Sequence, residues 1–276
     1  MKVEERITEN IINQLENGII PWRKPWSGSS VAFNRVSKKA YNFTNQMLLP
    51  QPGEYATYKQ WNALGGKIKK GETASYVVGK GVSKYTKIDP ETGEEKEYTR
   101  WNKKVYPVFH ISQVEGVEPL DITETVGEFH DDRKAEDVIE AYIGRYETLT
   151  LKHTYGSGAN YCPATDTVNL PEKEQFCDEA EYYSTAFHEC VHSTGHASRL
   201  NRQFDAFGSE TYSKEELVAE IGSCMLLDIL GIETDATFEN SGAYIASWLK
   251  ALKNDVSMIG YAAGKAKAAV DMILEM

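Results

Sequence analysis

AFHECVHSTGH, residues 186–196, contains the pattern HExxH at His188, Glu189 and His192. On an α-helix, residues four apart lie on one face about one turn apart, so both imidazoles can reach a single metal ion. Glu189 then lies beside the ion, where it can act on water. With 6 His and 29 Glu in 276 residues, chance produces the pattern roughly 0.014 times per chain. The pattern therefore indicates a metal site on a helix; the alternative is a surface helix that carries these residues by coincidence.

A third protein ligand is expected, because a catalytic zinc ion usually takes three protein ligands and leaves its fourth position to water. The longer pattern HExxHxxGxxH would supply a His, but Ser198 stands at that position, and His196 has no matching spacing. The segment SKEELVAEIGSCMLLDIL, residues 213–230, is the better source. Glu216 and Glu220 share one face of this predicted helix. We expect Glu216 to bind the ion and Glu220 to accept a hydrogen bond from a ligating His, with the opposite assignment left open.

These residues predict a zinc-dependent peptidase with one Zn²⁺ per chain. Glu216 and Glu220 resemble the ExxxD signature of gluzincin peptidases, with Glu in place of Asp, and the adjacent Glu215 is predicted to turn away. Zinc would polarise the scissile carbonyl, and Glu189 would pass a proton from water to the leaving amine. Tyr212, one turn before Glu216, is our candidate for the donor that stabilises the oxyanion.

Two further expectations concern the surroundings of the site. His153 and Tyr155 are alternatives to Tyr212 as the oxyanion donor, because they end a predicted strand. Residues 165–170 are expected to form a sheet edge to which an extended peptide adds as a further strand.

Charge divides the chain into two parts. The net charge is -11, but residues 1–120 hold 18 Lys and Arg against 13 Asp and Glu, a net +5, which leaves 12 against 28, a net -16, for residues 121–276. The first part also holds four of the five Trp. Parts of opposite charge favour different partners. We therefore predict two domains, 1–120 and 131–276, joined by an acidic linker at 121–130.

Composition also excludes several classes of protein. The four Cys include no CxxC pair, so neither a disulfide scaffold nor a Cys-rich zinc knuckle is expected. The first ten residues, MKVEERITEN, are acidic where a signal peptide would be apolar. No apolar run approaches the ~20 residues of a membrane-spanning helix. We expect a cytoplasmic protein without a membrane partner.

Periodicity predicts an α+β protein: an α+β domain followed by a mainly helical domain with a small sheet. In the first domain a helix over 3–15 ends before Gly18, and a second, YKQWNAL, is capped by Thr57. A long hairpin follows. The expected hairpin strands are 74–88 and 96–114, and the later elements are a helix near 135–143, strands at 148–154 and 165–171, and helices over 178–194, 214–230 and 241–275, the last broken near Asn254.

The first domain interleaves aromatic and basic residues, which is typical of proteins that bind single-stranded nucleic acid through a basic groove and stacking platforms. For any one Trp or Tyr, burial in a core is the alternative. The candidate nucleic-acid-binding residues are Trp22, Arg23, Lys24, Trp26, Arg35, Lys38, Lys39, Tyr41, Lys67, Lys69, Lys70, Arg100, Trp101, Lys103 and Lys104.

The order of segments along the chain resembles that of the ArdC-like antirestriction proteins. The matching segments are IIPWRKPW, YNFTNQMLL, ATYKQWNALGGKIKKGE, VYPVFHISQVEG, YCPATDTVNLP, FHECVHSTGHASRLNR and EELVAEIGS. The run AFNRVSKKAYNFTN departs from the family's usual pattern. The resemblance implies an N-terminal domain that binds single-stranded DNA and a C-terminal zincin-like metallopeptidase domain.

The same resemblance implies a protein of a plasmid or other mobile element that protects incoming DNA. Its partners would be single-stranded DNA and a peptide or protein substrate, for which a component of a restriction system is a candidate. The competing interpretation is a DNA-binding or DNA-mimic protein without enzymatic activity, in which the metal is structural. The net charge of -16 in the second part is the observation that favours it.

Overall fold

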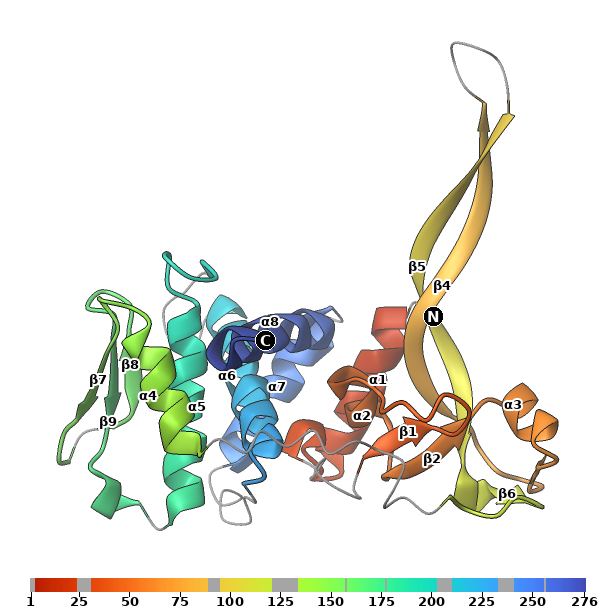
Figure 1. Cartoon of the computed structure of the whole chain (residues 1–276), viewed down its shortest axis with the longest axis horizontal. Coiled ribbons are helices and arrows are strands. Elements are labelled where there is room, and N and C mark those ends of the chain that lie inside the picture. Colours follow the sequence, from red (N-terminus) through yellow and green to blue (C-terminus); the bar gives the residue numbers. More distant parts are fainter. Residues whose placement is uncertain are drawn as a thin grey trace. The chain divides into compact units, whose positions relative to one another are not determined.

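A computed structural model describes residues 3–23, 31–88, 95–120, 134–156, 158–176, 178–202, 210–232, 241–255 and 257–276 (Figure 1). The chain forms two compact units, Met1–Arg6 with Val31–Val126 and Ile7–Ser30 with Gly127–Met276. Helices and small sheets make up both, so the predicted α+β class is confirmed. The predicted linker at 121–130 lies outside the described residues, and the domain limits stay a prediction.

The first unit is built on a four-stranded sheet in the order β1-β2-β5-β4. Strand β1 runs parallel to β2, and the other neighbours are antiparallel. A small antiparallel pair, β3 and β6, lies beside it. The strands are β1 (Ala32–Asn34), β2 (Gly53–Ala56), β3 (Lys67–Ile68), β4 (Ser75–Ile88), β5 (Glu95–His110) and β6 (Val114–Glu115), and the helices are α2 (Phe43–Leu48) and α3 (Tyr58–Ala63).

Local sequence signals explain α3. The Thr57 side chain accepts a hydrogen bond from the backbone N–H of Gln60, and the Gln60 side chain accepts one from the backbone N–H of Thr57. This capping box satisfies donors that the first turn leaves free. Gly65, just beyond the helix, has φ +82, a conformation that favours glycine. The predicted helix YKQWNAL is thereby confirmed.

Two buried amides on α2 bind neighbouring strands. Asn45 donates to the carbonyl of Val78 at 2.9 Å and accepts from its N–H at 2.7 Å. Gln46 makes the same pair of bonds to Ala32, at 2.9 and 3.0 Å. Each side-chain amide therefore pairs with a backbone N–H and a backbone carbonyl, as a neighbouring strand would, so these groups are not buried without hydrogen-bond partners. These residues of the YNFTNQMLL segment hold the sheet together.

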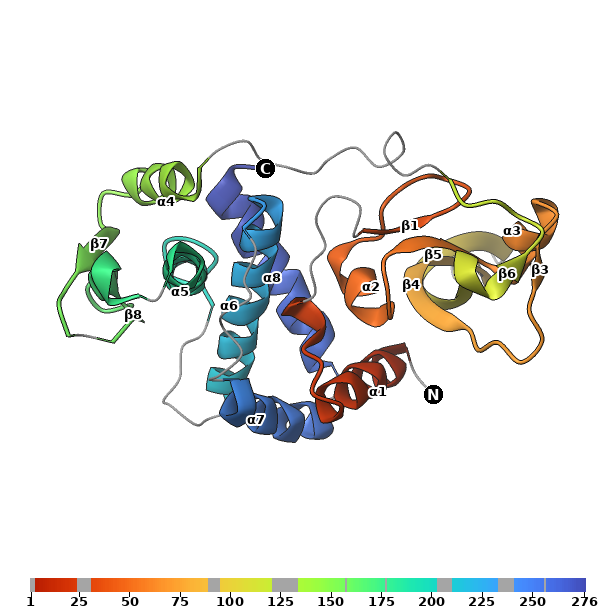
Figure 2. The same cartoon turned by 90° about the horizontal axis from the view of Figure 1, so that it is seen from below.

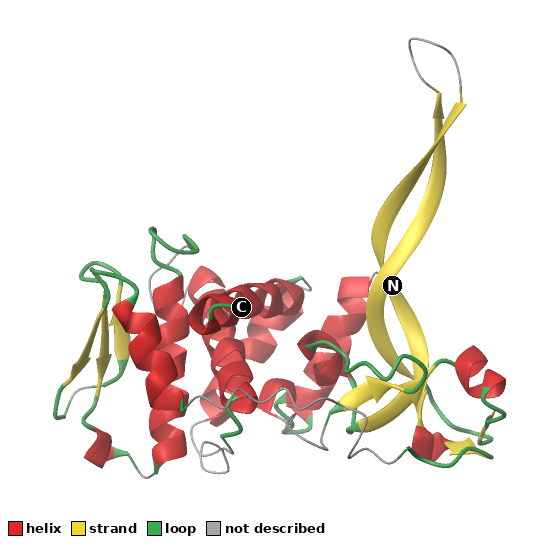
Figure 3. Ribbon diagram, viewed as in Figure 1, coloured by secondary structure: helices red, strands yellow, loops and turns green. Residues whose placement is uncertain are grey.

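The predicted hairpin is confirmed as β4 and β5, which pair without a break from Ser75↔Val108 to Ile88↔Glu95. Residues 89–94, which connect these strands, lie outside the described residues. Because β2 pairs with β5 only at Tyr55↔His110 and Ala56↔Phe109, most of the hairpin is a two-stranded ribbon (Figure 3).

The second unit is mainly helical. Its elements are most of α1 (Val3–Glu16), α4 (Ala135–Gly144), β7 (Thr150–His153), β8 (Asn160–Cys162), β9 (Thr167–Leu170), α5 (Glu179–Thr194), α6 (Glu210–Ile229), α7 (Ser241–Asn254) and α8 (Met258–Leu274). The break predicted near Asn254 separates α7 from α8. None of the helices in the described part of the chain is long and apolar enough to cross a membrane.

The small sheet has the order β7-β9-β8, so β9 is its central strand. The expectation that residues 165–170 form a free edge is therefore wrong. The sequence showed only two of the three strands, because Asn160–Cys162 is too short to produce a pattern. Helix α5 packs against β8 and β9 on one side and against α6 and α8 on the other (Figure 2).

A buried ion pair joins the sheet to the end of α5. Arg199, just after α5, donates to both carboxylate oxygens of Asp166 and to the carbonyl of Ser193. Thr148 and Tyr161 also donate to Asp166, at 2.6 and 2.8 Å. Burial disfavours the charged carboxylate, but these hydrogen bonds outweigh burial and hold the pKa of Asp166 well below its usual value.

Asp166→Asn is expected to lower the free energy of unfolding by about 3–5 kcal/mol at pH 7, because it leaves Arg199 buried without a counter-charge. The folded carboxyl has the lower pKa, so its stabilisation is present above the ordinary pKa of about 3.9 and is lost as the pH falls below it. Urea unfolding at pH 7 and pH 3 should show the difference between wild type and variant shrinking. Asp271→Asn, which breaks an exposed pair with Lys267, should change the free energy by less than about 0.5 kcal/mol; an equal effect of both variants would contradict the account.

Candidate metal centre

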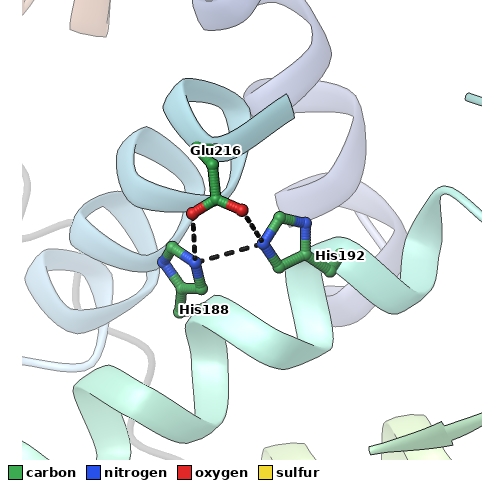
Figure 4. Close-up of side chains that lie close together, drawn as sticks. All are labelled: His188, His192 and Glu216. Atoms are coloured by element: carbon green, nitrogen blue, oxygen red, sulfur yellow. Dashed lines mark hydrogen bonds and ion pairs between the residues drawn. The ribbon is translucent and has the colours of Figure 1, made fainter. Parts of the chain in front are cut away.

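Helices α5 and α6 bring His188, His192 and Glu216 together (Figure 4). The Nε2 atoms of the two His rings lie 3.1 Å apart. Oε1 of Glu216 lies 3.4 Å from Nε2 of His192, and Oε2 lies 3.6 Å from Nε2 of His188. The three side chains lie together, and Glu216 is the carboxylate that faces the Nε2 atoms of both rings.

These spacings fit a tetrahedral divalent ion. Zinc bonds of about 2.0–2.2 Å to nitrogen and oxygen at tetrahedral angles place neighbouring ligand atoms about 3.3–3.5 Å apart. The two Nε2 atoms lie 3.1 Å apart, and each lies 3.4–3.6 Å from one of the two oxygens of Glu216, which is close to that spacing. The described residues offer three candidate ligands, and a tetrahedral ion held by them would have one further position.

Glu189 follows His188 on α5 and is 8% exposed. It is not a member of the three-residue cluster. The side chain is thus buried beside the cluster without belonging to it, which is the arrangement that the HExxH pattern predicts for a proton acceptor.

Each of the two rings has another carboxylate near its Nδ1 atom. Nδ1 of His188 lies 3.8 Å from Oε2 of Glu220, outside hydrogen-bond distance but on the side that the sequence predicts. Nδ1 of His192 lies 3.2 Å from Oε1 of Glu215. Because an ionised carboxylate only accepts, Nδ1 of His192 donates the hydrogen of this bond, and Nε2 is the nitrogen turned toward His188 and Glu216.

The prediction that Glu215 turns away from the site is wrong. Glu215 is 6% exposed and is held by Arg202. Nε of Arg202 donates to both carboxylate oxygens of Glu215, and Nη2 donates to Oε1, at 2.7–3.2 Å. Arg202 also donates to Thr194 and to the carbonyl of Val191 near the end of α5. The arginine therefore holds together the end of one helix and the carboxylate that orients His192.

Arg202 was missed because helical periodicity does not connect a loop arginine with a carboxylate 13 residues away. The available signal was composition: SRLNR places two arginines directly after the motif, in a part of the chain with a net charge of -16. Both are used internally, Arg199 on Asp166 and Arg202 on Glu215.

Electrostatics in the cluster favour charged carboxylates. Burial disfavours the charge on Glu215 and Glu216, but hydrogen bonds from His192, Arg202 and His188 outweigh it and hold the pKa of both carboxyls below the usual value. Burial also disfavours the charged form of His192, yet hydrogen bonds to Glu215 and Glu216 raise the pKa of the ring. A metal must therefore displace a proton from His192, and metal affinity should increase with pH.

Helices α5 and α6 approach closely at Gly222. A Cβ atom at that position would lie 2.8 Å from Cγ2 of Val191. Nearby, the Ser223 hydroxyl donates to the carbonyl of Ser184 at 2.8 Å. Val191 precedes His192 on α5, and Gly222 lies on the same helix as Glu216, so the missing side chain of Gly222 lets the two helices that carry the cluster approach closely.

Gly222→Ala is expected to push the helices apart, to destabilise the chain by about 1–3 kcal/mol through overpacking, and to weaken metal binding. Gly264→Ala is the matched control, because Gly264 lies in α8 with open space around its Cα. That change should be neutral or stabilising by about 0.5–1 kcal/mol. Thermal unfolding and metal titration measure both effects; unchanged metal affinity in Gly222→Ala would contradict the role of the close approach.

The other predicted site residues have different positions. His196 lies outside the cluster, and its Nδ1 pairs with the Ser198 hydroxyl at 2.8 Å. His153 pairs with the hydroxyl of Tyr182 at 3.1 Å, and Tyr155 is 82% exposed. The backbone of Tyr212 is part of α6, but its side chain lies outside the described residues. The oxyanion donor stays a prediction.

Three of the candidate nucleic-acid-binding residues are not free surface groups. Trp22 is fully buried and packs edge-to-face on Trp248, with ring centroids 5.1 Å apart. No face of Trp22 is left for a base, so we correct its assignment to a core residue. Arg35 forms a buried ion pair with Glu54, and Tyr41 packs against the sheet core of the first unit.

The remaining candidates divide into described and undescribed residues. Lys24, Trp26 and the side chain of Arg23 lie outside the described residues. The exposed candidates are Lys38, Lys39, Lys67, Lys69, Lys70, Arg100, Trp101, Lys103 and Lys104. Lys67 also lines a hollow of about 500 Å³ beside α3 and β3.

Two family models match the chain. The model described as the N-terminal domain of anti-restriction factor ArdC matches residues 1–114, and the model described as a zincin-like metallopeptidase matches residues 137–265. The second match includes both His residues and Glu216.

Curated relatives cover the chain almost completely. It is 34% identical over 285 residues to the uncharacterized protein y4eC of Sinorhizobium fredii, covering 98% of this chain and 90% of that protein. It is 35% identical over 292 residues to a DNA primase TraC of Escherichia coli, covering 98% of this chain and 27% of the primase. The chain thus spans about a quarter of the length of that primase.

Solved structures match over the full chain. The metal-free crystal structure of the antirestriction protein ArdC from the R388 plasmid has a TM-score of 0.72 and 34% identity, covering 100% of this chain and 97% of that one. The Mn(II)-bound structure of the same protein has a TM-score of 0.73 and 33% identity, covering 100% and 98%.

Proposed function

The chain belongs to the family of ArdC-like antirestriction proteins, and we propose that it binds single-stranded DNA with its first unit and hydrolyses peptide bonds with the metal centre of its second. The resident ion is proposed to be zinc. The resemblance inferred from the order of sequence segments is confirmed at the level of the family.

The proposed hydrolysis rests on one observation: the Nε2 atoms of His188 and His192 face each other and the carboxylate of Glu216 at 3.1–3.6 Å, and Glu189 is buried next to them. Two imidazoles and one carboxylate suit zinc, although manganese is also accepted by nitrogen and oxygen donors. A divalent ion held there would supply Lewis-acid polarisation of the scissile carbonyl and of water.

The residues of the chain have separate tasks in this proposal. Glu189 accepts the proton of the attacking water and returns it to the leaving amine. Glu215, held by Arg202, fixes the ring of His192 so that Nε2 faces the ligand cluster. Glu220 lies where it can do the same for His188.

Removal of metal tests the hydrolytic part of the proposal. A chain treated with a chelator should cleave no member of a mixed peptide library, and one equivalent of Zn²⁺ should restore cleavage, because the open position disappears with the ion. Mass spectrometry of the library measures both. Cleavage that persists without metal would contradict the proposal, as would a fully zinc-loaded chain that cleaves nothing with or without single-stranded DNA.

The DNA-binding part is supported by the family of the first unit and by the net charge of +5 over residues 1–120. Neutralised phosphates release counterions, so affinity for a single-stranded oligonucleotide should fall with salt at a log–log slope of about -0.7 per contact. Fluorescence anisotropy measures this slope. A chain that binds no oligonucleotide at low salt would contradict the proposal.

The non-enzymatic alternative is not favoured. A structural zinc site closes its fourth position with protein, whereas the part of the chain that the structure describes contributes three ligands. The acidic charge of the second part, which suggested a DNA mimic, includes the buried carboxylates Asp166, Glu189 and Glu215. These groups are used inside the unit.

A further inference from the structure

The ribbon formed by β4 and β5 exposes apolar side chains that no described element covers. Trp101 is 66% exposed, and Val82, directly opposite it in the register, is 55% exposed. Two-stranded ribbons are at best marginally stable alone in water. An exposed indole on such a ribbon packs into no core and is free to contact a ligand. Figure 1 shows the ribbon extending beyond the sheet of the first unit.

The register places the basic residues of the ribbon around this pair. Residues two apart on a strand share a face, so Lys80 and Lys103, which are opposite each other, lie one step from Val82 and Trp101. Lys84 lies one step away on the other side and forms an ion pair with Glu97 at 3.0 Å, in which both side chains are exposed and screened by water. Lys103 lies 3.9 Å from a carboxylate oxygen of Glu4, and both side chains are exposed, so water screens this pair.

The opposite face of the ribbon differs because its rings already have partners. Tyr85 and Tyr98 stack on each other with centroids 5.7 Å apart and planes at 23°. Tyr106 lies over Gly79 and receives Lys104 above its ring at 5.5 Å. The Trp101 face therefore carries the free stacking surface.

The charge of the ribbon and its exposed indole indicate which kind of ligand binds this face. Residues 75–88 and 95–110 contain seven Lys and Arg against two Glu, a net +5. A polyanion is attracted to such a surface. Unpaired bases offer flat apolar faces for stacking on an indole, whereas a duplex keeps those faces inside its own stack. The combination fits a single strand.

We propose that the face of the ribbon formed by Val82 and Trp101 is the base-stacking platform for single-stranded DNA, with Lys80, Lys84 and Lys103 on its phosphates. The inference rests on the proposed DNA binding of the first unit and adds where the strand lies. It assigns Val82, Lys80 and Lys84 to the interface as new members.

The test compares variants of the full chain by anisotropy with a labelled single-stranded oligonucleotide. Trp101→Ala should raise the Kd about 5- to 150-fold, the range expected for one lost stacking contact, and Trp101→Phe should restore most of the affinity. Lys80→Ala combined with Lys103→Ala should reduce the log–log salt slope by about 1.4, whereas Trp101→Ala should leave the slope unchanged. Circular dichroism confirms that each variant is folded.

Tyr261→Ala is the matched control, because Tyr261 is an exposed ring in α8 with Lys265 5.7 Å from its centroid. It should bind like the wild type. If the wild type binds and Trp101→Ala binds equally well, the ribbon proposal is overturned while the proposed function stands. If the wild type binds no oligonucleotide, both fail. A duplex that binds as tightly as the single strand and loses as much affinity in Trp101→Ala would overturn the assignment to single strands.

Discussion

Glu189→Gln is expected to abolish peptide hydrolysis while one equivalent of metal stays bound. Gln keeps the size and polarity of the side chain but cannot take a proton from water, and general base catalysis typically contributes about 10²–10⁴-fold to the rate. The metal is retained because Glu189 lies outside the cluster of His188, His192 and Glu216. Metal analysis and peptide cleavage of the same preparation measure the two properties separately.

Glu179→Gln is the matched control for this variant. Glu179 lies in the first turn of the same helix, more than two turns from the ligands, and its side chain is exposed. The Glu179→Gln variant should keep both its metal content and its rate of peptide cleavage. A Glu189→Gln chain that purifies without metal would make Glu189 a ligand, and a variant that cleaves peptides at the wild-type rate would remove its role as base.

Glu216→Ala is expected to eliminate tight metal binding, whereas Glu215→Ala and Glu220→Ala should weaken it about 10–100-fold. Glu216 lies within 3.4–3.6 Å of both ligating nitrogens, while the other two carboxylates face Nδ1 atoms. Removing an oxygen ligand removes a bond to the ion. Removing an orienting carboxylate leaves the bonds in place but lets the His ring turn away from its best orientation. Calorimetric titration with Zn²⁺ measures all three.

The variant that loses the most metal affinity identifies the carboxylate that binds the ion. A larger loss in Glu220→Ala than in Glu216→Ala would place the ligand one turn further along α6. Glu172→Ala serves as the control, because Glu172 is a carboxylate that caps a short turn away from the cluster. Its variant should bind metal like the wild type.

The close approach of His188, His192 and Glu216 was predictable because the two His residues follow one helical period. His188 and His192 lie one turn apart, and a Glu on the next amphipathic helix meets them when the apolar faces of α5 and α6 pack together. The broken C-terminal helix and the capped helix α3 were predictable for the same reason, since caps and periods are local. The family resemblance added the order of the domains.

Other features depend on contacts between distant residues, which local patterns do not contain. The buried pair of Arg202 and Glu215 joins a loop to a helix, and the sequence showed only two charged residues. Strand β9 is central because β8 pairs with its free side, and β8 is too short to detect. Its position removes the peptide-binding edge expected at 165–170.

The aromatic residues of the first 120 positions show that sequence alone does not separate core rings from exposed rings. Trp22 and Trp101 both stand next to an arginine in the sequence, yet Trp22 is fully buried and Trp101 is 66% exposed. Trp22 packs on Trp248, 226 positions away in the chain. Composition alone predicts that some aromatic rings bind bases, but only the tertiary contacts separate those rings from the core.

Anomalous X-ray scattering at the zinc edge, from crystals of the zinc-loaded chain, tests the central claim most directly. The account predicts one anomalous peak per chain, bonded to Nε2 of His188, Nε2 of His192 and an oxygen of Glu216, with bonds of about 2.0–2.2 Å and one position open to solvent. A peak bonded to other residues, a fourth protein ligand that closes the site, or no peak in a zinc-loaded crystal would contradict it.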